Sequence, residues 1–203
     1  SLAEHWEGKG SFASYHLLRM DERKGKTAAV KQALEFINQT NKSDLVLMTD
    51  ADAMFEVDTV ANLLKWFSDK SIGCVGATPK RIGQRIEEEG LRTLFSMVRH
   101  LESKIDSTPF LEGSCMVWRT SSLDLEALHL TSNADDAQIA TNVRIHGLRV
   151  IQDSDAHFID HAPFERKEHS RQKVRRAQGL QRHLLRQREH WYSHRLGKFS
   201  PIL

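Results

Sequence analysis

The sequence contains few of the residues that build disulfide-rich or disordered proteins. It has 2 cysteines, 4 prolines and 11 glycines among 203 residues. Two cysteines are too few for a disulfide framework, and Cys74 and Cys115 each lie inside an apolar run. This favours buried thiols in a reducing compartment over a zinc site. Hydrophobic residues make up 39% of the chain, so we expect one globular domain with a sizeable core.

The sequence also lacks long hydrophobic runs and a strong overall charge. No stretch reaches the roughly 18 to 20 consecutive apolar residues that a membrane-spanning helix needs, and we find no signal-peptide pattern. The formal net charge of +2 hides an asymmetry, because residues 165–198 contain 11 Lys or Arg against 3 Glu. This basic end predicts an anionic partner.

Alternating helical patterns and short apolar runs predict an α/β fold. Helices are expected over 26–39, 57–67, 87–103, 134–146 and 166–188, and buried strands over 44–49 and 72–78. Residues 110–119 form an apolar segment, and short strands are expected over 148–152 and 156–162. A strand, helix, strand succession favours parallel pairing. We therefore expect a mainly parallel central sheet flanked by helices over residues 1–164, followed by a basic helical segment over 165–203.

Two acidic residues, Asp50 and Asp52, directly follow the apolar run LVLMT. Carboxylates at this spacing can both reach one Mg²⁺ or Mn²⁺, whose remaining positions are commonly filled by phosphate oxygens and water. The pair is therefore a candidate metal site for a diphosphate. The alternative interpretation is an acidic turn that caps the helix beginning near Val57.

A second acidic pair, Asp135 and Asp136, begins the helix predicted over 134–146. Acid in the first turn complements the helix macrodipole, so a structural role is one interpretation. The other interpretation is a general base. A carboxylate near a like charge has a raised pKa, and a base needs only to accept a proton from an attacking hydroxyl.

The basic segment SRQKVRRAQGLQRHLLRQR places Gln172 and either Arg175 or Arg176 on one helical face. Arginine binds phosphate through paired hydrogen bonds, so this segment could hold a leaving diphosphate. The alternatives are a solvated basic helix and a nucleic-acid-binding helix. Because the segment lacks the interleaved aromatics of single-strand binders, we expect no nucleic acid partner. Lys26, at a predicted helix start, is a further candidate phosphate contact.

Five segments follow one another along the chain: GKTAAVKQALE, DLVLMTDADA, FLEGSCMVWRTSSL, ADDAQIATNVRIHGLRVI and SRQKVRRAQGL. In this order they resemble the serial motifs of family-2 glycosyltransferases of the GT-A fold, the group that includes cellulose and hyaluronan synthases. Each motif is weak alone, but the set in the right order is specific. The resemblance implies an inverting, metal-dependent hexosyltransferase of polysaccharide or lipid-linked sugar synthesis. Such an enzyme moves a sugar from a nucleotide-diphosphate donor, which we expect to be a UDP-sugar, to a hydroxyl acceptor.

The resemblance also implies roles for individual residues. Asp136 corresponds to the catalytic base, and Asp50 and Asp52 to the ligands of Mg²⁺ or Mn²⁺. His157 lies on the strand that supplies a further metal ligand in some GT-A enzymes, although a structural role is the alternative. Substrate contacts are implied at Lys26, Asp50, Gly113, Ser114, Asp135, Gln172, Arg175 and Arg176.

The sequence departs from the family pattern in three places. Arg176 stands where processive synthases carry Trp, which puts processivity in doubt, and Lys31 stands where the donor-side helix often has Asn. Nothing before Gly25 resembles the strand that opens the family's nucleotide site, so we expect a chain that is incomplete at its N-terminus.

Apolar residues near the C-terminus lie among Arg and His, as in a helix at an anionic membrane surface: Leu180, Leu184, Trp191, Tyr192 and Leu196. Packing against the domain itself is the alternative. Many family relatives continue into transmembrane helices after this motif. We therefore expect a membrane-attached protein with this catalytic domain on the cytoplasmic face.

Two other classes compete with the glycosyltransferase interpretation. LVLMTDADAM also resembles the D-x-D strand of haloacid-dehalogenase-type phosphohydrolases, but those enzymes place it on their first strand and carry Thr or Val where this chain has Met54. The other class is a non-enzymatic module whose basic tail binds nucleic acid or lipid. In that case the acidic residues would be structural.

Overall fold

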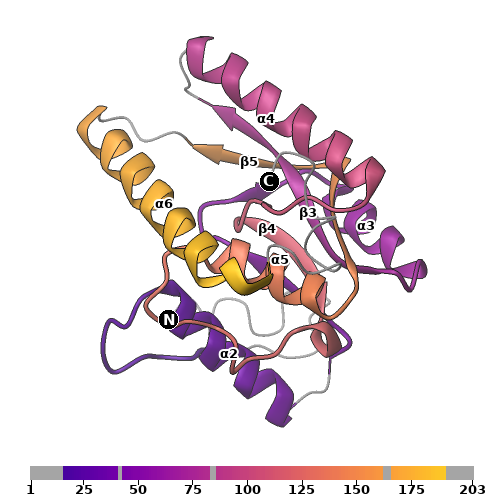
Figure 1. Cartoon of the computed structure of the whole chain (residues 1–203), viewed down its shortest axis with the longest axis vertical. Coiled ribbons are helices and arrows are strands. Elements are labelled where there is room, and N and C mark those ends of the chain that lie inside the picture. The colour runs from indigo at the N-terminus through magenta and orange to yellow at the C-terminus, as the bar shows by residue number, and fades with distance from the viewer. Residues whose placement is uncertain (1–15, 41–42, 83–85, 162–165, 191–203) are drawn as a thin grey trace.

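The structure is a computed structural model that describes residues 16–40, 43–82, 86–161 and 166–190 (Figure 1). The helices are α2 (Lys26–Thr40), α3 (Thr59–Leu64), α4 (Ile86–Ile105), α5 (Asp135–Ile145) and α6 (Arg166–Arg186). The strands are β1 (Leu45–Thr49), β2 (Met54–Phe55), β3 (Ile72–Ile82), β4 (Cys115–Arg119) and β5 (Arg149–His161). The predicted α/β class and the flanking helices are confirmed. The C-terminal residues Trp191, Tyr192 and Leu196 lie outside the described residues, as does the side chain of His161.

The sheet is mixed, so the prediction of a mainly parallel sheet was wrong in this respect. Its strand order is β1-β4-β3-β5-β2, and only β3 and β5 pair in parallel among the described strands. The strand, helix, strand succession does make β1 and β3 run in the same direction, as expected. However, β4 lies between them and runs the opposite way. The strand, helix, strand succession predicts that β1 and β3 run in the same direction, but it does not predict that β4 lies between them.

The two strands predicted over 148–152 and 156–162 form the single long strand β5. The polar residues Asp153 to Asp155 interrupt its hydrophobic pattern. They lie where the ladder with β3 is irregular, because Gly76 pairs with Gln152 while Thr78 pairs with His157. The Asp153 carboxylate accepts a hydrogen bond from Trp66 Nε1 at 2.8 Å. In the sequence, this irregular stretch within the single strand β5 therefore resembled a turn between two strands.

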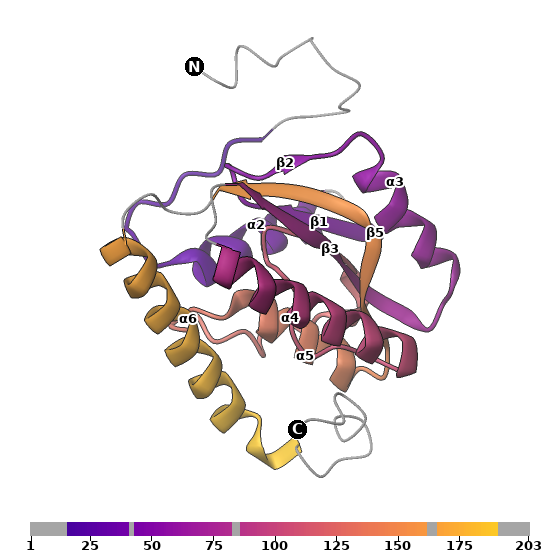
Figure 2. The ribbon, with the colours of Figure 1, turned by 90° about the horizontal axis from the view of Figure 1, so that it is seen from above.

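Two hydrophobic clusters pack against opposite faces of the sheet. Neighbouring strand residues belong to different clusters: Cys74 packs with α2 and α5, whereas Val75 packs with α3. Figure 2 shows α3 on one side of the sheet and α4, α5 and α6 on the other. Both cysteines are buried and unpaired, as predicted, and burial raises the pKa of Cys115 to about 12.

The helix ends place the residues that matter for function. Gly25, directly before α2, has a φ of +91°, a conformation that favours glycine. Gly147, with a φ of +85°, follows α5 as the predicted C-terminal glycine. Within the described ranges, no helix is long and apolar enough to span a membrane.

Candidate active site

The antiparallel pairing of β1 and β4 brings two candidate residues together. Thr49, the last residue of β1, pairs with Cys115, the first residue of β4. Asp50 follows the first strand and Ser114 precedes the second, so they meet at the same edge of the sheet. Ser114 Oγ donates a hydrogen bond to Asp50 Oδ2 at 2.7 Å.

Lys26 joins these residues to the start of α5. Its Nζ lies 2.6 Å from Asp50 Oδ1 and 3.4 Å from Asp135 Oδ2. Burial alone would lower the pKa of Lys26, but Asp135 and Asp50 hold this pKa above its ordinary value. Burial alone would raise the pKa of Asp50, but hydrogen bonds from Lys26 and Ser114 hold that pKa below its ordinary value. Asp50 is therefore ionised at neutral pH.

Asp136 differs electrostatically from Asp50. Burial of its carboxyl group raises the pKa of Asp136 to about 6, and the negative charges of Asp135 and Glu112 contribute in the same direction. One carboxylate oxygen, Oδ1, accepts a hydrogen bond from the backbone N–H of Ala137 at 2.8 Å. A carboxylate with this pKa is suited to accept a proton near neutral pH.

Gly113 leaves space at the centre of the site. A Cβ at this position would lie 3.2 Å from Asp136 Cβ and 3.6 Å from Lys26 Nζ. A methyl group here would press on Asp136 and would be in ordinary contact with Lys26. The small residue predicted to contact substrate thus lies between the candidate base and the candidate phosphate contact.

These residues line one cavity of about 650 Å³. Arg175 and Arg176 of α6 line it as well, and the charge of Arg176 acts on Asp50. Of the predicted site residues, the cavity brings together Lys26, Asp50, Gly113, Ser114, Asp135, Asp136, Arg175 and Arg176. Gln172, Asp52 and His157 are described but are not among the lining residues.

The residues proposed to bind metal do not form a closed cage. Asp52 is exposed in the turn after β1, and its carboxylate has no hydrogen bond or ion pair within the described part of the chain. His157 lies on β5, where its buried Nδ1 has no partner in the same residues. No group of three or more His, Cys, Asp or Glu in the described ranges could hold a metal ion. Such a donor set fits a hard cation that takes its other oxygens from water and phosphate.

Sequence reasoning missed one side of the cavity. Arg99 Nη1 donates a hydrogen bond to Glu112 Oε1 at 3.0 Å, and both residues line the cavity. This side of the cavity also contains Glu102 of α4 and five apolar residues, Phe95, Val98, Pro109, Phe110 and Leu111. Glu112 directly precedes the Gly113-Ser114 motif, and this neighbouring position could have identified Glu112 as a site residue.

Two contacts hold α6 against the rest of the site. Gly179 lies so close to Asn133 that a Cβ would be 3.3 Å from its backbone carbonyl. Further along the helix, His183 Nε2 lies 2.8 Å from Thr141 Oγ1 of α5. Burial lowers the pKa of His183 to about 4, so it is neutral at physiological pH. These contacts position the arginines of α6 at the cavity.

The profile of glycosyltransferase-like family 2 matches residues 13–179. The chain therefore belongs to this family, which confirms the resemblance of its motifs. No curated protein sequence matches the chain. The phosphohydrolase and non-enzymatic interpretations receive no support from the family assignment.

A solved glycosyltransferase shares the fold. The mannosyltransferase PcManGT from Pyrobaculum calidifontis, in complex with GDP-Man and Mn²⁺, superposes with a TM-score of 0.76 at 23% identity over 97% of this chain. Glucosyl-3-phosphoglycerate synthase from Mycobacterium tuberculosis, in complex with Mn²⁺ and UDP-glucose, gives a TM-score of 0.46 at 18% identity over 80% of this chain. The chain spans 58% and 55% of the lengths of these two proteins.

Proposed function

We propose that this chain transfers a sugar from a nucleotide-diphosphate donor to a hydroxyl acceptor, with Asp136 as the catalytic base. The observation that carries the proposal is the convergence of cationic and acidic groups at one cavity. Lys26 and Arg176 lie there with Asp50, whose pKa is lowered, and with Asp136, whose pKa is raised to about 6. Groups with such different pKa values serve different roles in one reaction.

The cationic end of the cavity suits the diphosphate of the donor. In this structure, Asp50 and Asp135 neutralise Lys26, and a donor phosphate would compete with them for its ammonium group. Arg175 and Arg176 add two further charges from α6. These cations would stabilise the negative charge that develops on the diphosphate as it leaves.

Asp52 and Asp50 would hold a divalent cation, with Mg²⁺ and Mn²⁺ as the candidates. When bound, the cation neutralises the diphosphate leaving group. The exposed Asp52 carboxylate supports this role, as does the presence of GDP-Man and Mn²⁺ in the mannosyltransferase of the same fold.

Asp136 would accept the proton of the acceptor hydroxyl. The space beside Gly113 borders Asp136 Oδ2, and it is the place where a hydroxyl could approach that oxygen. A base acting on an external hydroxyl implies one direct displacement at the anomeric carbon. We therefore propose that the configuration of the sugar inverts.

The basic surface of α6 supports attachment of the protein to a membrane on its cytoplasmic face. Exposed cations along the described part of this helix include Arg171, Arg175, Arg176, Arg182 and Arg186. A surface of this charge favours anionic lipid head groups. The acceptor would then be a lipid-linked or polysaccharide hydroxyl close to that surface.

Calorimetric titration with UDP and GDP, each with and without Mn²⁺, tests the donor site. We expect metal-dependent binding that is lost in Asp52→Ala and retained in Asp58→Ala. Asp58 is a matched control because it is exposed and its side chain does not cap α3. Metal-dependent binding that is equal in wild type and Asp52→Ala would contradict the assigned metal role and place the cation elsewhere.

A further inference from the structure

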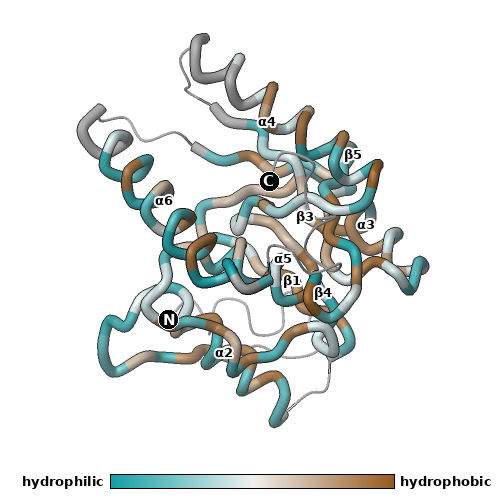
Figure 3. Tube along the Cα trace, in the orientation of Figure 1, coloured by the Kyte–Doolittle hydropathy of each residue, from teal (hydrophilic) through white to brown (hydrophobic). Residues whose placement is uncertain are grey.

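One face of α4 is apolar and exposed. Leu94, Met97, Leu101 and Ile105 expose 51%, 56%, 49% and 74% of their surface. Their spacing of three and four residues places them in one stripe along the helix. The opposite face packs on β5, where Ser103 Oγ accepts a hydrogen bond from the backbone N–H of Gln152. Figure 3 shows the hydrophobic residues along α4. A contiguous stripe, unlike single exposed leucines, indicates a contact surface.

The stripe is continuous with the apolar side of the active-site cavity. Phe95 and Val98 of the same helix line the cavity together with Pro109, Phe110 and Leu111. Phe95 is also exposed, so apolar surface extends from the outer face of α4 to the side of the cavity that holds Glu112. The side of the cavity toward α4 is mainly apolar, with Arg99, Glu102 and Glu112 as its charged residues, and the side toward α6 is cationic.

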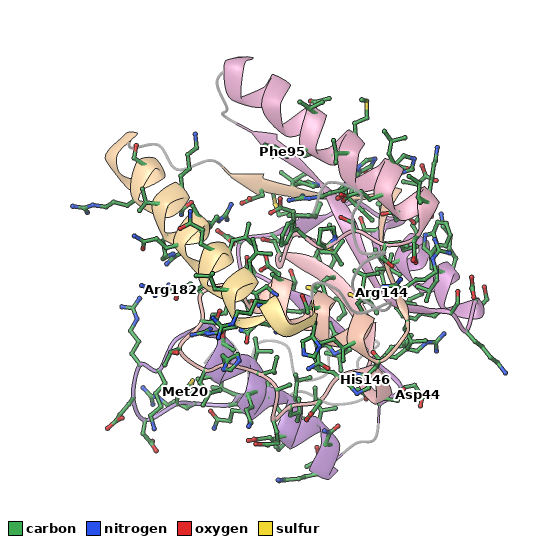
Figure 4. All side chains as sticks on the ribbon, in the orientation of Figure 1. Met20, Asp44, Phe95, Arg144, His146 and Arg182 are labelled. Carbon is green, nitrogen blue, oxygen red and sulfur yellow. The ribbon has the colours of Figure 1, made fainter. Side chains whose placement is uncertain are left out.

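The helix on the cationic side carries a dense positive charge. Residues 166–186 contain eight Lys or Arg and one Glu, and Arg175 and Arg176 line the cavity. Figure 2 shows α4 and α6 on the same side of the sheet, and Figure 4 labels Phe95 on the first helix and Arg182 on the second. A molecule that contacts both helices needs a hydrocarbon part and an anionic part.

We propose that the acceptor is carried on a lipid in an anionic membrane surface, with its hydrocarbon against the apolar stripe of α4. This inference rests on the proposed function and names the substrate class of the same cavity. The anionic head group lies against α6, and the hydroxyl that attacks reaches Asp136 past Glu112. A soluble sugar acceptor would leave the apolar stripe of α4 without a role. A second copy of this chain would cover the stripe but would bring another basic α6 rather than an anionic surface.

Vesicle flotation tests the surface. Wild type, the double variant Met97→Asp/Leu101→Asp and the control Val57→Asp are mixed with phosphatidylcholine vesicles that contain or lack phosphatidylglycerol. Val57 is 100% exposed and lies shortly before α3, the helix that Figure 2 shows on the other side of the sheet. All three side chains are exposed, so the variants should retain the wild-type thermal unfolding midpoint.

We expect wild type and Val57→Asp to float with the vesicles that contain phosphatidylglycerol and the double variant to lose at least about tenfold in membrane affinity. Equal flotation of all three proteins would overturn the proposal. A double variant that changes from dimer to monomer in light scattering, without a change in flotation, would show that the stripe binds a second copy instead.

The binding of n-alkyl phosphates tests the link between stripe and cavity. Each methylene buried on α4 should tighten binding by up to roughly fourfold in wild type, and this dependence on chain length should vanish in the double variant. Affinity that is independent of chain length would also overturn the proposal. Titration with UDP or GDP and Mn²⁺ tests the proposed function separately from the lipid acceptor. Intact nucleotide binding without any chain-length dependence contradicts the lipid acceptor alone, whereas absent nucleotide binding contradicts the proposed function.

Discussion

Lys26 Nζ lies 2.6 Å from Asp50 Oδ1, and this ion pair joins the start of α2 to the end of β1. The glycine before α2 and the end of strand β1 place both groups at the edge of the sheet. The same ammonium group lies 3.4 Å from Asp135 Oδ2 at the start of α5. One cation thus connects three elements that are distant in the sequence.

The loss of this cation should weaken donor binding. Lys26→Met removes a charge-assisted contact to the diphosphate, and we expect the Kd for a nucleoside diphosphate to rise about tenfold or more. Lys24→Met is the matched control, because Lys24 is exposed and contacts Glu22 only at 3.8 Å. Isothermal titration calorimetry measures both. Equal losses in the two variants would indicate a general charge effect rather than a specific contact.

Substitution of the central glycine should impair transfer while the fold remains intact. In Gly113→Ala the new methyl group would lie 3.2 Å from Asp136 Cβ and fill the approach to the carboxyl group. We expect a fall of at least about tenfold in kcat/KM, since small displacements of reacting groups are costly. Gly90→Ala is the control, because nothing lies within 4 Å of a Cβ at that position. An active Gly113→Ala enzyme would show that the acceptor does not enter beside this glycine.

Crowding of the contact between α6 and Asn133 should weaken donor binding by displacing Arg175 and Arg176 of this helix. In Gly179→Val the new Cβ would lie 3.3 Å from the Asn133 backbone, and the rest of the side chain would press on it. The helix must shift, so we expect weaker donor binding with a smaller change in kcat. Ala177→Val, at an exposed position of the same helix, should bind the donor as wild type does. Similar donor affinities for the two variants would show that the packing of α6 against Asn133 does not determine the geometry of the donor site.

The raised pKa of Asp136 makes a prediction about stability. Between the ordinary Asp pKa of about 3.9 and a pKa of about 6, the folded state retains a proton that the unfolded state has lost. The free energy of unfolding therefore falls as the pH rises through this range and stays lower above it. Asp136→Asn should be about 1 to 3 kcal/mol more stable than wild type at pH 7. The advantage should shrink near pH 4 in denaturant titrations, and a difference that is independent of pH would contradict it.

The sequence predicted most helices and strands because their hydrophobic patterns are strong, as in α2 and in the apolar run of β1. The prediction that β1 is buried was wrong, because only Met48 of its five residues is buried. The sequence did not predict the position of β4. The first four of the five residues of β4 are buried, so the hydrophobic pattern of this strand does not indicate which way it runs in the sheet. The pairing of Thr49 with Cys115 depends on contacts between distant segments, which no local pattern encodes.

The candidate site was predictable where its residues follow strands or begin helices. Asp50, Ser114 and Asp136 all stand at such ends, and the resemblance to the family assigned them roles. Phe95 and Arg99 were missed because they lie within α4, where the pattern only separates buried from exposed positions. The metal roles of Asp52 and His157 stay predictions.

The dependence of the transfer rate on pH is the decisive test of Asp136 as the catalytic base. The release of nucleoside diphosphate should be measured in the presence of donor, Mn²⁺ and acceptor for wild type and Asp136→Asn. We expect a wild-type rate that rises with pH and levels off above about 6, because Asp136 must be ionised to accept the proton. We also expect a loss of roughly 10²-fold or more in Asp136→Asn, without this dependence on pH. A variant that retains both the rate and the pH profile of wild type would contradict the assignment of Asp136 as the base.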